Sequence, residues 1–209
     1  MSLHEHDRPD DPEGSGSVTP RDDHAAIHIH PRPQRRGVSI FGGAPPVTGW
    51  TPGRYLTEGS PAVSWLTRNE SEPARAHERW ALGQSAAITV GRTFDLIVLP
   101  SQLIEATIKA PRDGWAIEGT FRRAGITCGV VVSRRQDTYQ VLVRPGTARK
   151  WSADEATAIG ADAHQPFLHA PPPGRRSGPG AFWLLLCPEA SDQLASADMV
   201  LALLRGDAR

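Results

Sequence analysis

The sequence predicts an α+β fold, in which flanking helices pack on a mixed or antiparallel sheet and a disordered N-terminal tail precedes the domain. Three observations in residues 63–209 predict this class: two β-branched runs joined by a polar turn, a continuous apolar run, and helical patterns at the start, middle and end. We therefore assign residues 1–62 to the tail and 63–209 to one domain.

The tail is rich in Pro, Gly, Ser, Asp, Arg and His, and it shows no sustained apolar periodicity. Such a segment buries too little apolar surface to offset the entropy lost on ordering. Its one apolar patch, residues 38–41, lies near Trp50 and Tyr55. The patch and these aromatic residues are candidate contacts for a protein partner, because aromatic side chains are favoured anchors in interfaces.

The first elements of the domain are a helix and two strands. Residues 72–82 form a predicted helix that starts after Ser71. Residues 86–90 and 94–99 are short β-prone runs separated by a polar turn at 91–93. This pattern is typical of a strand, a turn and a second strand.

The middle of the domain contains the clearest hairpin. A helix is predicted over residues 101–110, and residues 114–123 fit a strand, a helix or neither. Residues 127–133 and 138–144 are β-branched runs joined by the polar residues 134–137. They predict an antiparallel hairpin.

The last part combines a helix signal, an apolar run and a Pro-rich loop. Ser152 and Glu155 have the spacing of a capping box for a short helix. The continuous apolar run at 182–187 predicts a central strand. A short strand, a Pro-rich loop and a closing helix complete the order: residues 166–169, 171–180 and 191–204.

The charge balance excludes one simple argument for nucleic-acid binding. The chain has 23 Lys+Arg and 23 Asp+Glu, so its net charge is zero and no overall basicity attracts nucleic acid. The sequence has no apolar stretch long enough for a membrane span and no apolar leader segment, which predicts a cytoplasmic protein without a membrane partner. Cys128 and Cys187 lie in apolar segments and are expected to be core thiols.

Several catalytic motifs are missing from the sequence. It has no G-x-S-x-G elbow and no phosphate-binding P-loop, and its Gly pairs lack the strand-then-helix context of a dinucleotide site. Two-metal phosphoryl transfer needs paired carboxylates, usually as D-x-D on a strand. Asp95 has Ile97 at the position of the second acid, so it cannot form that pair.

The order of elements resembles a known family. A strand at 91–100, the hairpin at 129–146 and the Pro-rich motif at 167–175 follow one another as in the bifunctional DNA primase/polymerase N-terminal domain. The resemblance covers residues 65–190. It implies the fold of archaeo-eukaryotic primases, which use a D-x-D pair, a His on a later strand and a third acid to bind metals and nucleoside triphosphate.

The family's catalytic residues are only partly present. The first acidic strand offers Asp95 alone, and the strand that should carry the His contains Tyr139 and Gln140 instead. Asp162 matches the position of the third acid, and the nearby Asp154 and Glu155 are alternative candidates for it. A polymerase without its metal-holding pair loses the electrostatic stabilisation that dominates phosphoryl transfer.

These observations lead to one favoured function and two alternatives. The favoured one is a primase/polymerase-like domain that has lost catalysis and binds DNA or nucleotide weakly and salt-sensitively, or acts as a regulatory module. The candidate phosphate contacts are arginines in loops: Arg134, Arg135, Arg144, Arg175 and Arg176. The alternatives are a protein-interaction module that uses the tail, and an active enzyme whose Mg²⁺ or Mn²⁺ site is built from Asp95, Glu118 and Asp162. No cofactor is expected unless that site is active.

Overall fold

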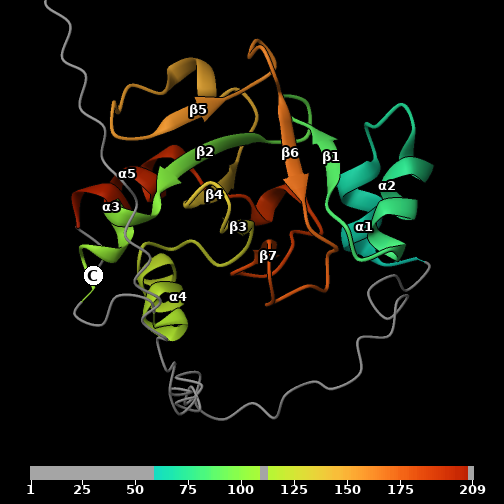
Figure 1. Ribbon diagram of the computed structural model, residues 1–209. Helices are drawn as coiled ribbons and strands as arrows, with labels where there is room; N and C mark the ends of the chain where they lie inside the picture. Colours follow the sequence, from blue (N-terminus) through green and yellow to red (C-terminus); the bar gives the residue numbers. More distant parts are fainter. Residues whose placement is uncertain (1–58, 109–112, 207–209) are drawn as a thin grey trace, which may run out of the picture. The chain divides into compact units, whose positions relative to one another are not determined.

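The computed structural model describes residues 59–108 and 113–206 (Figure 1). Its helices and strands are, in chain order, α1 (Pro61–Thr67), α2 (Pro73–Ala81), β1 (Ala86–Thr89), β2 (Asp95–Pro100), α3 (Ser101–Glu105), α4 (Gly114–Arg123), β3 (Val130–Ser133), β4 (Thr138–Val143), η1 (Ala148–Lys150), β5 (Thr157–Ile159), β6 (Phe167–Ala170), β7 (Ala181–Trp183), η2 (Ser191–Gln193) and α5 (Ala197–Arg205). Both sheets are antiparallel, so the predicted α+β class is confirmed.

The main sheet has five strands in the order β5-β2-β4-β3-β7. The predicted hairpin is present as β3 and β4, which pair from Val130 opposite Val141 to Ser133 opposite Thr138. Its turn needs one residue with positive φ, and Asp137 takes φ 52°. Asp tolerates this left-handed conformation better than a β-branched residue would.

The strands β1 and β2 are both present, but they do not pair with each other. β1 pairs with β6 in a separate two-stranded sheet, whereas β2 lies between β4 and β5. The turn between them contains Gly91 at φ 99°, and a Cβ on this residue would collide with the backbone of Ala161. Because Gly91 has no Cβ, the backbone of Ala161 can lie against this turn, which joins strands of two different sheets.

The five-stranded sheet is covered on both faces. Alternate residues of β2, β3 and β4 point to opposite faces, as the period of a strand requires. One face packs with α1, α2, β1 and β6 around Leu96, Val131 and Leu142, and the other packs with α3, α4 and α5 around Ile97, Val130 and Val141. Figure 1 shows α1 and α2 beside β1, and α3, α4 and α5 on the other side of the sheet.

Buried tryptophans help to hold the first of these layers. Trp65 and Trp80 are buried, and Trp65 stacks on Phe94 with 5.8 Å between ring centroids. The indole N–H of Trp80 donates to the carbonyl of Ala170 at the end of β6. α1 begins at Pro61, two residues before the expected start of the domain, because Pro fits the first turn of a helix.

Two segments differ from their expected structure. The apolar run at 182–187 does not form a central strand: β7 covers only Ala181–Trp183 and lies at the edge of the sheet. The capping-box segment forms a turn instead of a helix, because the indole N–H of Trp151 donates to the carbonyls of Ala153 and Ala156. Periodicity shows neither the short length of β7 nor the hydrogen bonds of the Trp151 indole.

The helix boundaries also shift. α2 begins after Glu72 and not after Ser71, and α5 begins at Ala197, where the hydroxyl of Ser196 accepts from the backbone N–H of Met199. α3 ends at Glu105, and the last two residues of the helix predicted there, 109 and 110, lie outside the described residues. Residues 1–58, which include the apolar patch at 38–41, lie outside them as well. No helix in the described ranges is apolar over enough residues to span a bilayer.

Candidate nucleic-acid interface

The β3–β4 turn presents two exposed arginines. Arg134 and Arg135 lie in this turn, and hydrogen bonds within it fix its shape. The amide oxygen of Gln136 accepts from the hydroxyl of Ser133 at 3.1 Å and from the side chain of Gln140 at 2.9 Å. These hydrogen bonds fix the backbone that carries the two arginines, so little backbone entropy is lost when they bind a ligand.

The far side of the turn is also anchored. The hydroxyl of Ser101, the first residue of α3, donates to the Asp137 carboxylate at 2.7 Å, and the Ser101 backbone N–H donates to the Asp137 carbonyl at 2.9 Å. These contacts connect the turn to α3.

Arg134 packs on an aromatic ring of the neighbouring strand. Val132 of β3 pairs with Phe182 of β7. Arg134 follows Val132 by two residues, just after the end of β3, so its side chain lies on the same face as the Phe182 ring. The guanidinium carbon of Arg134 lies 5.7 Å from the Phe182 ring centroid. This is cation–π geometry, and it leaves the guanidinium exposed for other contacts.

Arg176 lies next along this edge of the sheet. Its guanidinium donates to the carbonyl of Leu184, two residues after Phe182, at 2.8 Å. It also lies 3.7 Å from the Glu118 carboxylate on α4. Glu118 forms a closer ion pair with Arg122, at 2.7 Å, one helical turn further along α4.

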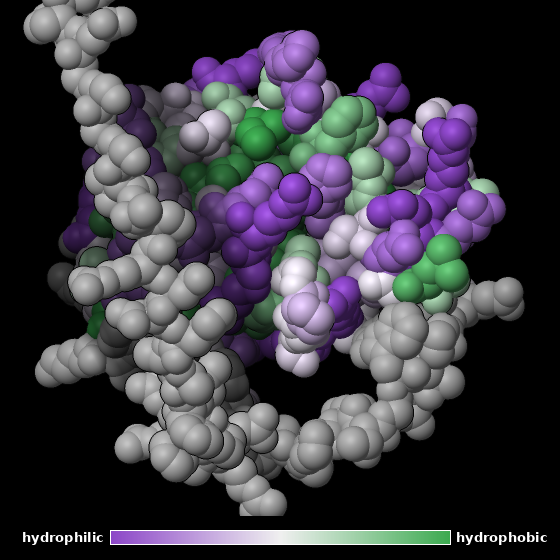
Figure 2. Space-filling model, in the orientation of Figure 1, coloured by the Kyte–Doolittle hydropathy of each residue, from purple (hydrophilic) through white to green (hydrophobic). Residues whose placement is uncertain are grey.

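The same face of α4 carries an exposed tryptophan. Trp115 precedes Glu118 by three residues, so the two side chains are neighbours on the helix. It is 83% exposed, the largest value among the four exposed large hydrophobic residues of the described ranges. In Figure 2 most of the visible surface is hydrophilic, with hydrophobic residues in separate patches between the polar ones.

The β3–β4 turn, β7, the loop before it and α4 together form one surface, which we call the arginine–aromatic surface. Its members are Arg134, Arg135, Phe182, Arg176, Arg122, Glu118 and Trp115. Arg135 belongs to it as the neighbour of Arg134, and Trp115 because it lies one helical turn from Glu118. Guanidinium groups bind phosphate oxygens in bidentate fashion, and aromatic rings stack on bases. This combination of side chains is typical of nucleic-acid binding.

Sequence reasoning found only part of this surface. The sequence predicts neither Trp115 nor Arg122 as a phosphate or base contact, although Arg122 belongs to an arginine pair, because residues 114–123 have no clear secondary-structure pattern. It predicts Phe182 as the start of a central strand. The side chain of Asp113 caps α4 by accepting from the backbone N–H of Trp115 at 3.0 Å. An Asp immediately before the segment was the available signal for a helix start.

Two of the five arginines predicted to contact phosphate, Arg175 and Arg144, do not belong to the arginine–aromatic surface. The Arg175 guanidinium donates to the carbonyls of Ser177, Gly83 and Pro179, so it clamps the Pro-rich loop and is not free for phosphate. Arg144 follows β4 at the end opposite the turn, and a strand of 6 residues separates the two ends by about 20 Å. The five arginines therefore do not line one groove.

Each of the three predicted metal-binding acids has a partner of its own. Asp95 is buried, and its carboxylate accepts from the backbone N–H of Ala148 at 2.9 Å. Asp162 is exposed and pairs with Arg149 at 3.1 Å, while Glu118 faces the arginines described above. No group of three or more His, Cys, Asp or Glu side chains in the described residues is arranged to hold a metal ion.

β4 matches the strand that carries a His in the primase/polymerase family, but the side chain of its Tyr139 packs in the core of this domain. Tyr139 is buried against Phe121, and its hydroxyl donates to Glu105 at 3.3 Å. Burial and the nearby Glu105 raise the pKa of Tyr139 well above its ordinary value. The hydroxyl therefore stays protonated and holds Glu105 by its hydrogen bond.

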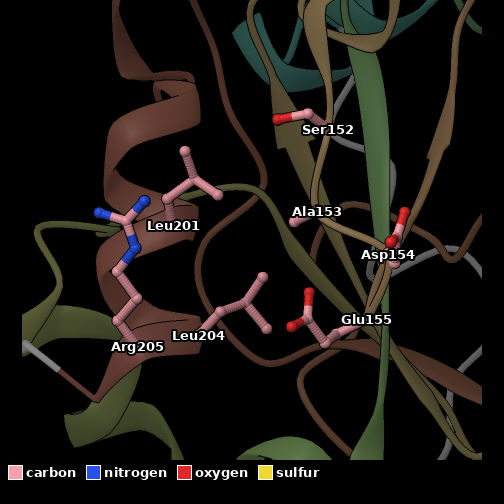
Figure 3. A pocket seen from close by; sticks show the side chains of 7 residues that line it. All are labelled: Ser152, Ala153, Asp154, Glu155, Leu201, Leu204 and Arg205. Atoms are coloured by element: carbon pink, nitrogen blue, oxygen red, sulfur yellow. The ribbon is translucent and has the colours of Figure 1, made fainter.

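A cavity of about 340 Å³ lies between α5 and the turn before β5 (Figure 3). Leu201, Leu204 and Arg205 line the α5 side, and residues 152–155 line the other. Asp154 and Glu155 contribute two carboxylates. Their negative charge disfavours a phosphate ligand, so this cavity is a poorer nucleotide site than the arginine–aromatic surface.

No protein-family model matches the chain, and no curated protein or solved structure matches it either. The primase/polymerase-like arrangement within the α+β class thus remains a prediction.

Proposed function

We propose that this chain is a non-catalytic binding domain that contacts nucleic acid through the arginine–aromatic surface. The observation that carries the proposal is the exposed arginine pair Arg134 and Arg135 on a hydrogen-bonded turn, next to Phe182 and Arg176. Neither arginine of the pair has an ion-pair partner within the described ranges, so both positive charges are available to phosphates.

The local charge explains how a neutral chain can bind a polyanion. Exposed guanidinium groups of Arg134, Arg135, Arg122 and Arg176 share this surface with the Glu118 carboxylate, and the carboxylates of Asp137, in the same turn, and Asp113, at the start of α4, lie beside it. Attraction between exposed charges is screened beyond about 10 Å at 0.1 M salt, so this local excess matters more than the net charge. Binding is therefore weak and strongly salt-dependent, as expected when a few arginines displace counterions.

The test is fluorescence anisotropy with a labelled oligonucleotide of about 20 nucleotides at about 50 mM salt, followed by a salt titration. We expect the double variant Arg134→Gln/Arg135→Gln to bind at least about tenfold more weakly. The slope of log K against log salt should fall by about 0.7 for each lost phosphate contact with a single strand, or about 1.4 for two.

The matched control is Arg68→Gln/Arg92→Gln, which removes the same charge. Arg68 follows α1 and Arg92 lies in the turn between β1 and β2, and both are exposed. Equal losses in both double variants would show a non-specific charge effect and overturn the proposal. Undetectable binding of the unsubstituted protein at this low salt would also overturn it.

Loss of catalysis is tested separately, by primer extension with Mg²⁺ or Mn²⁺. We expect no synthesis, because Asp95 holds the backbone of Ala148 and the other two acids face arginines. Robust synthesis that Asp95→Ala abolishes, in a variant shown to be folded by circular dichroism, would instead support the active enzyme.

A further inference from the structure

Trp115 differs from the other described tryptophans. The indole N–H groups of Trp65, Trp80, Trp151 and Trp183 each donate to an oxygen of the protein. For Trp115, no such acceptor lies in the described residues, and the side chain is 83% exposed. A large ring in this setting contributes little to the folded core.

The helix beneath Trp115 is nevertheless firmly held. Ile117, Thr120 and Phe121 of α4 are buried, and Asp113 caps the first turn. The backbone of Trp115 is thus fixed by packing on its neighbours, while the ring projects from the surface. An aromatic ring on a rigid helix is pre-organised for stacking, because few torsions are lost on binding.

The charges around the ring point to the chemistry of its ligand. Trp115 lies one helical turn from Glu118, whose carboxylate holds Arg122 at 2.7 Å and approaches Arg176 at 3.7 Å. The ring and the two guanidinium groups therefore lie on one face. A base on the ring and its phosphates on the arginines would together match a flexible, single-stranded chain.

We infer that Trp115 is a stacking platform for an unpaired nucleobase, so that the ligand of the arginine–aromatic surface is single-stranded nucleic acid. This inference rests on the proposed function and deepens it. A duplex offers its phosphates to the arginines, but its bases are stacked on one another and do not reach the ring. The arginines contribute to binding of both forms, whereas Trp115 contributes only to binding of the single strand.

The experiment compares an oligothymidylate of about 20 nucleotides with a duplex of the same length, at about 50 mM salt. Trp115→Leu removes the ring and keeps an apolar side chain. We expect it to weaken single-strand binding about 5- to 100-fold and to leave duplex binding within about twofold. Trp115→Phe keeps a ring and should stay within about threefold of the unsubstituted protein for both ligands.

Fluorescence supplies a second measurement. Trp115 is the most exposed described tryptophan, so oligothymidylate should quench emission from the unsubstituted protein more strongly than from Trp115→Phe. Because the ring is exposed, both variants are expected to keep the fold, which circular dichroism verifies.

The outcomes separate this inference from the proposed function. If Trp115→Leu leaves single-strand binding unchanged, or weakens single-strand and duplex binding equally, the stacking role is wrong. If Arg134→Gln/Arg135→Gln still weakens binding in that case, the proposed function stands. If the unsubstituted protein binds neither oligonucleotide, both are wrong, and Trp115 becomes a candidate anchor for a protein partner.

Discussion

Glu118 offers the sharpest test of the arginine–aromatic surface, because its removal should improve binding while it weakens the fold. Its carboxylate neutralises Arg122 at 2.7 Å and approaches Arg176 at 3.7 Å, and its side chain is only 17% exposed. A phosphate on the far side of either guanidinium would lie about 7 Å from the carboxylate. At a water-like dielectric constant, the repulsion is about 0.6 kcal/mol per phosphate.

The variant Glu118→Gln removes this repulsion and keeps the size of the side chain. With two phosphates, the gain is about 1.2 kcal/mol, or about eightfold tighter binding. Loss of the Glu118–Arg122 pair, which has the favourable i,i+4 order, should lower the free energy of unfolding by about 0.5 kcal/mol.

The assay is anisotropy with labelled oligothymidylate at about 50 mM salt, paired with urea denaturation. The control is Glu78→Gln, which removes an exposed carboxylate from α2. If Glu118→Gln binds no more tightly than this control, or more weakly than the unsubstituted protein, phosphates do not contact Arg122 and Arg176 and the reasoning fails.

Three further predictions concern the fold. Asp95→Asn loses the charge of the group that holds the Ala148 backbone, so urea denaturation should show about 1–2 kcal/mol lower stability; an unchanged midpoint would contradict this role. Gly91→Ala should lose at least about 2 kcal/mol, because the residue has φ 99° and its Cβ would collide with the Ala161 backbone; wild-type thermal stability would contradict this. Burial raises the pKa of Cys187 well above its ordinary value, so in native protein a disulfide reagent at pH 8 should modify this thiol far more slowly than after unfolding; equal rates would show an open site.

The local sequence is sufficient to predict an element when the contacts that stabilise it join residues close together in the chain. The β3–β4 hairpin could be predicted because β-branched runs flank a polar turn, and the register follows from that turn. The exposure of Arg134 and Arg135 could also be predicted from the sequence, because residues in the turn of a hairpin usually lie at the protein surface. The absence of a D-x-D pair also follows from residue identity alone, as Ile97 stands in the second position and the structure buries it in the core.

The remaining features depend on contacts between distant segments. The pairing of β1 with β6 joins residues about 80 positions apart, and no local signal separates it from a hairpin with β2. Contacts between distant segments also give different roles to arginines that look alike in the sequence. Arg175 donates to three carbonyl groups, whereas Arg134 packs on the Phe182 ring of β7.

The class of the fold, the β3–β4 hairpin and the absence of a D-x-D pair at Asp95 follow from local residue pattern. Which of the described charges are free depends instead on contacts between distant segments. Packing α4 on the face of the sheet that carries Phe182 places Glu118, with its ion-pair partner Arg122, 3.7 Å from Arg176, and a surface of this kind is a property of packed elements that no segment of the chain carries alone.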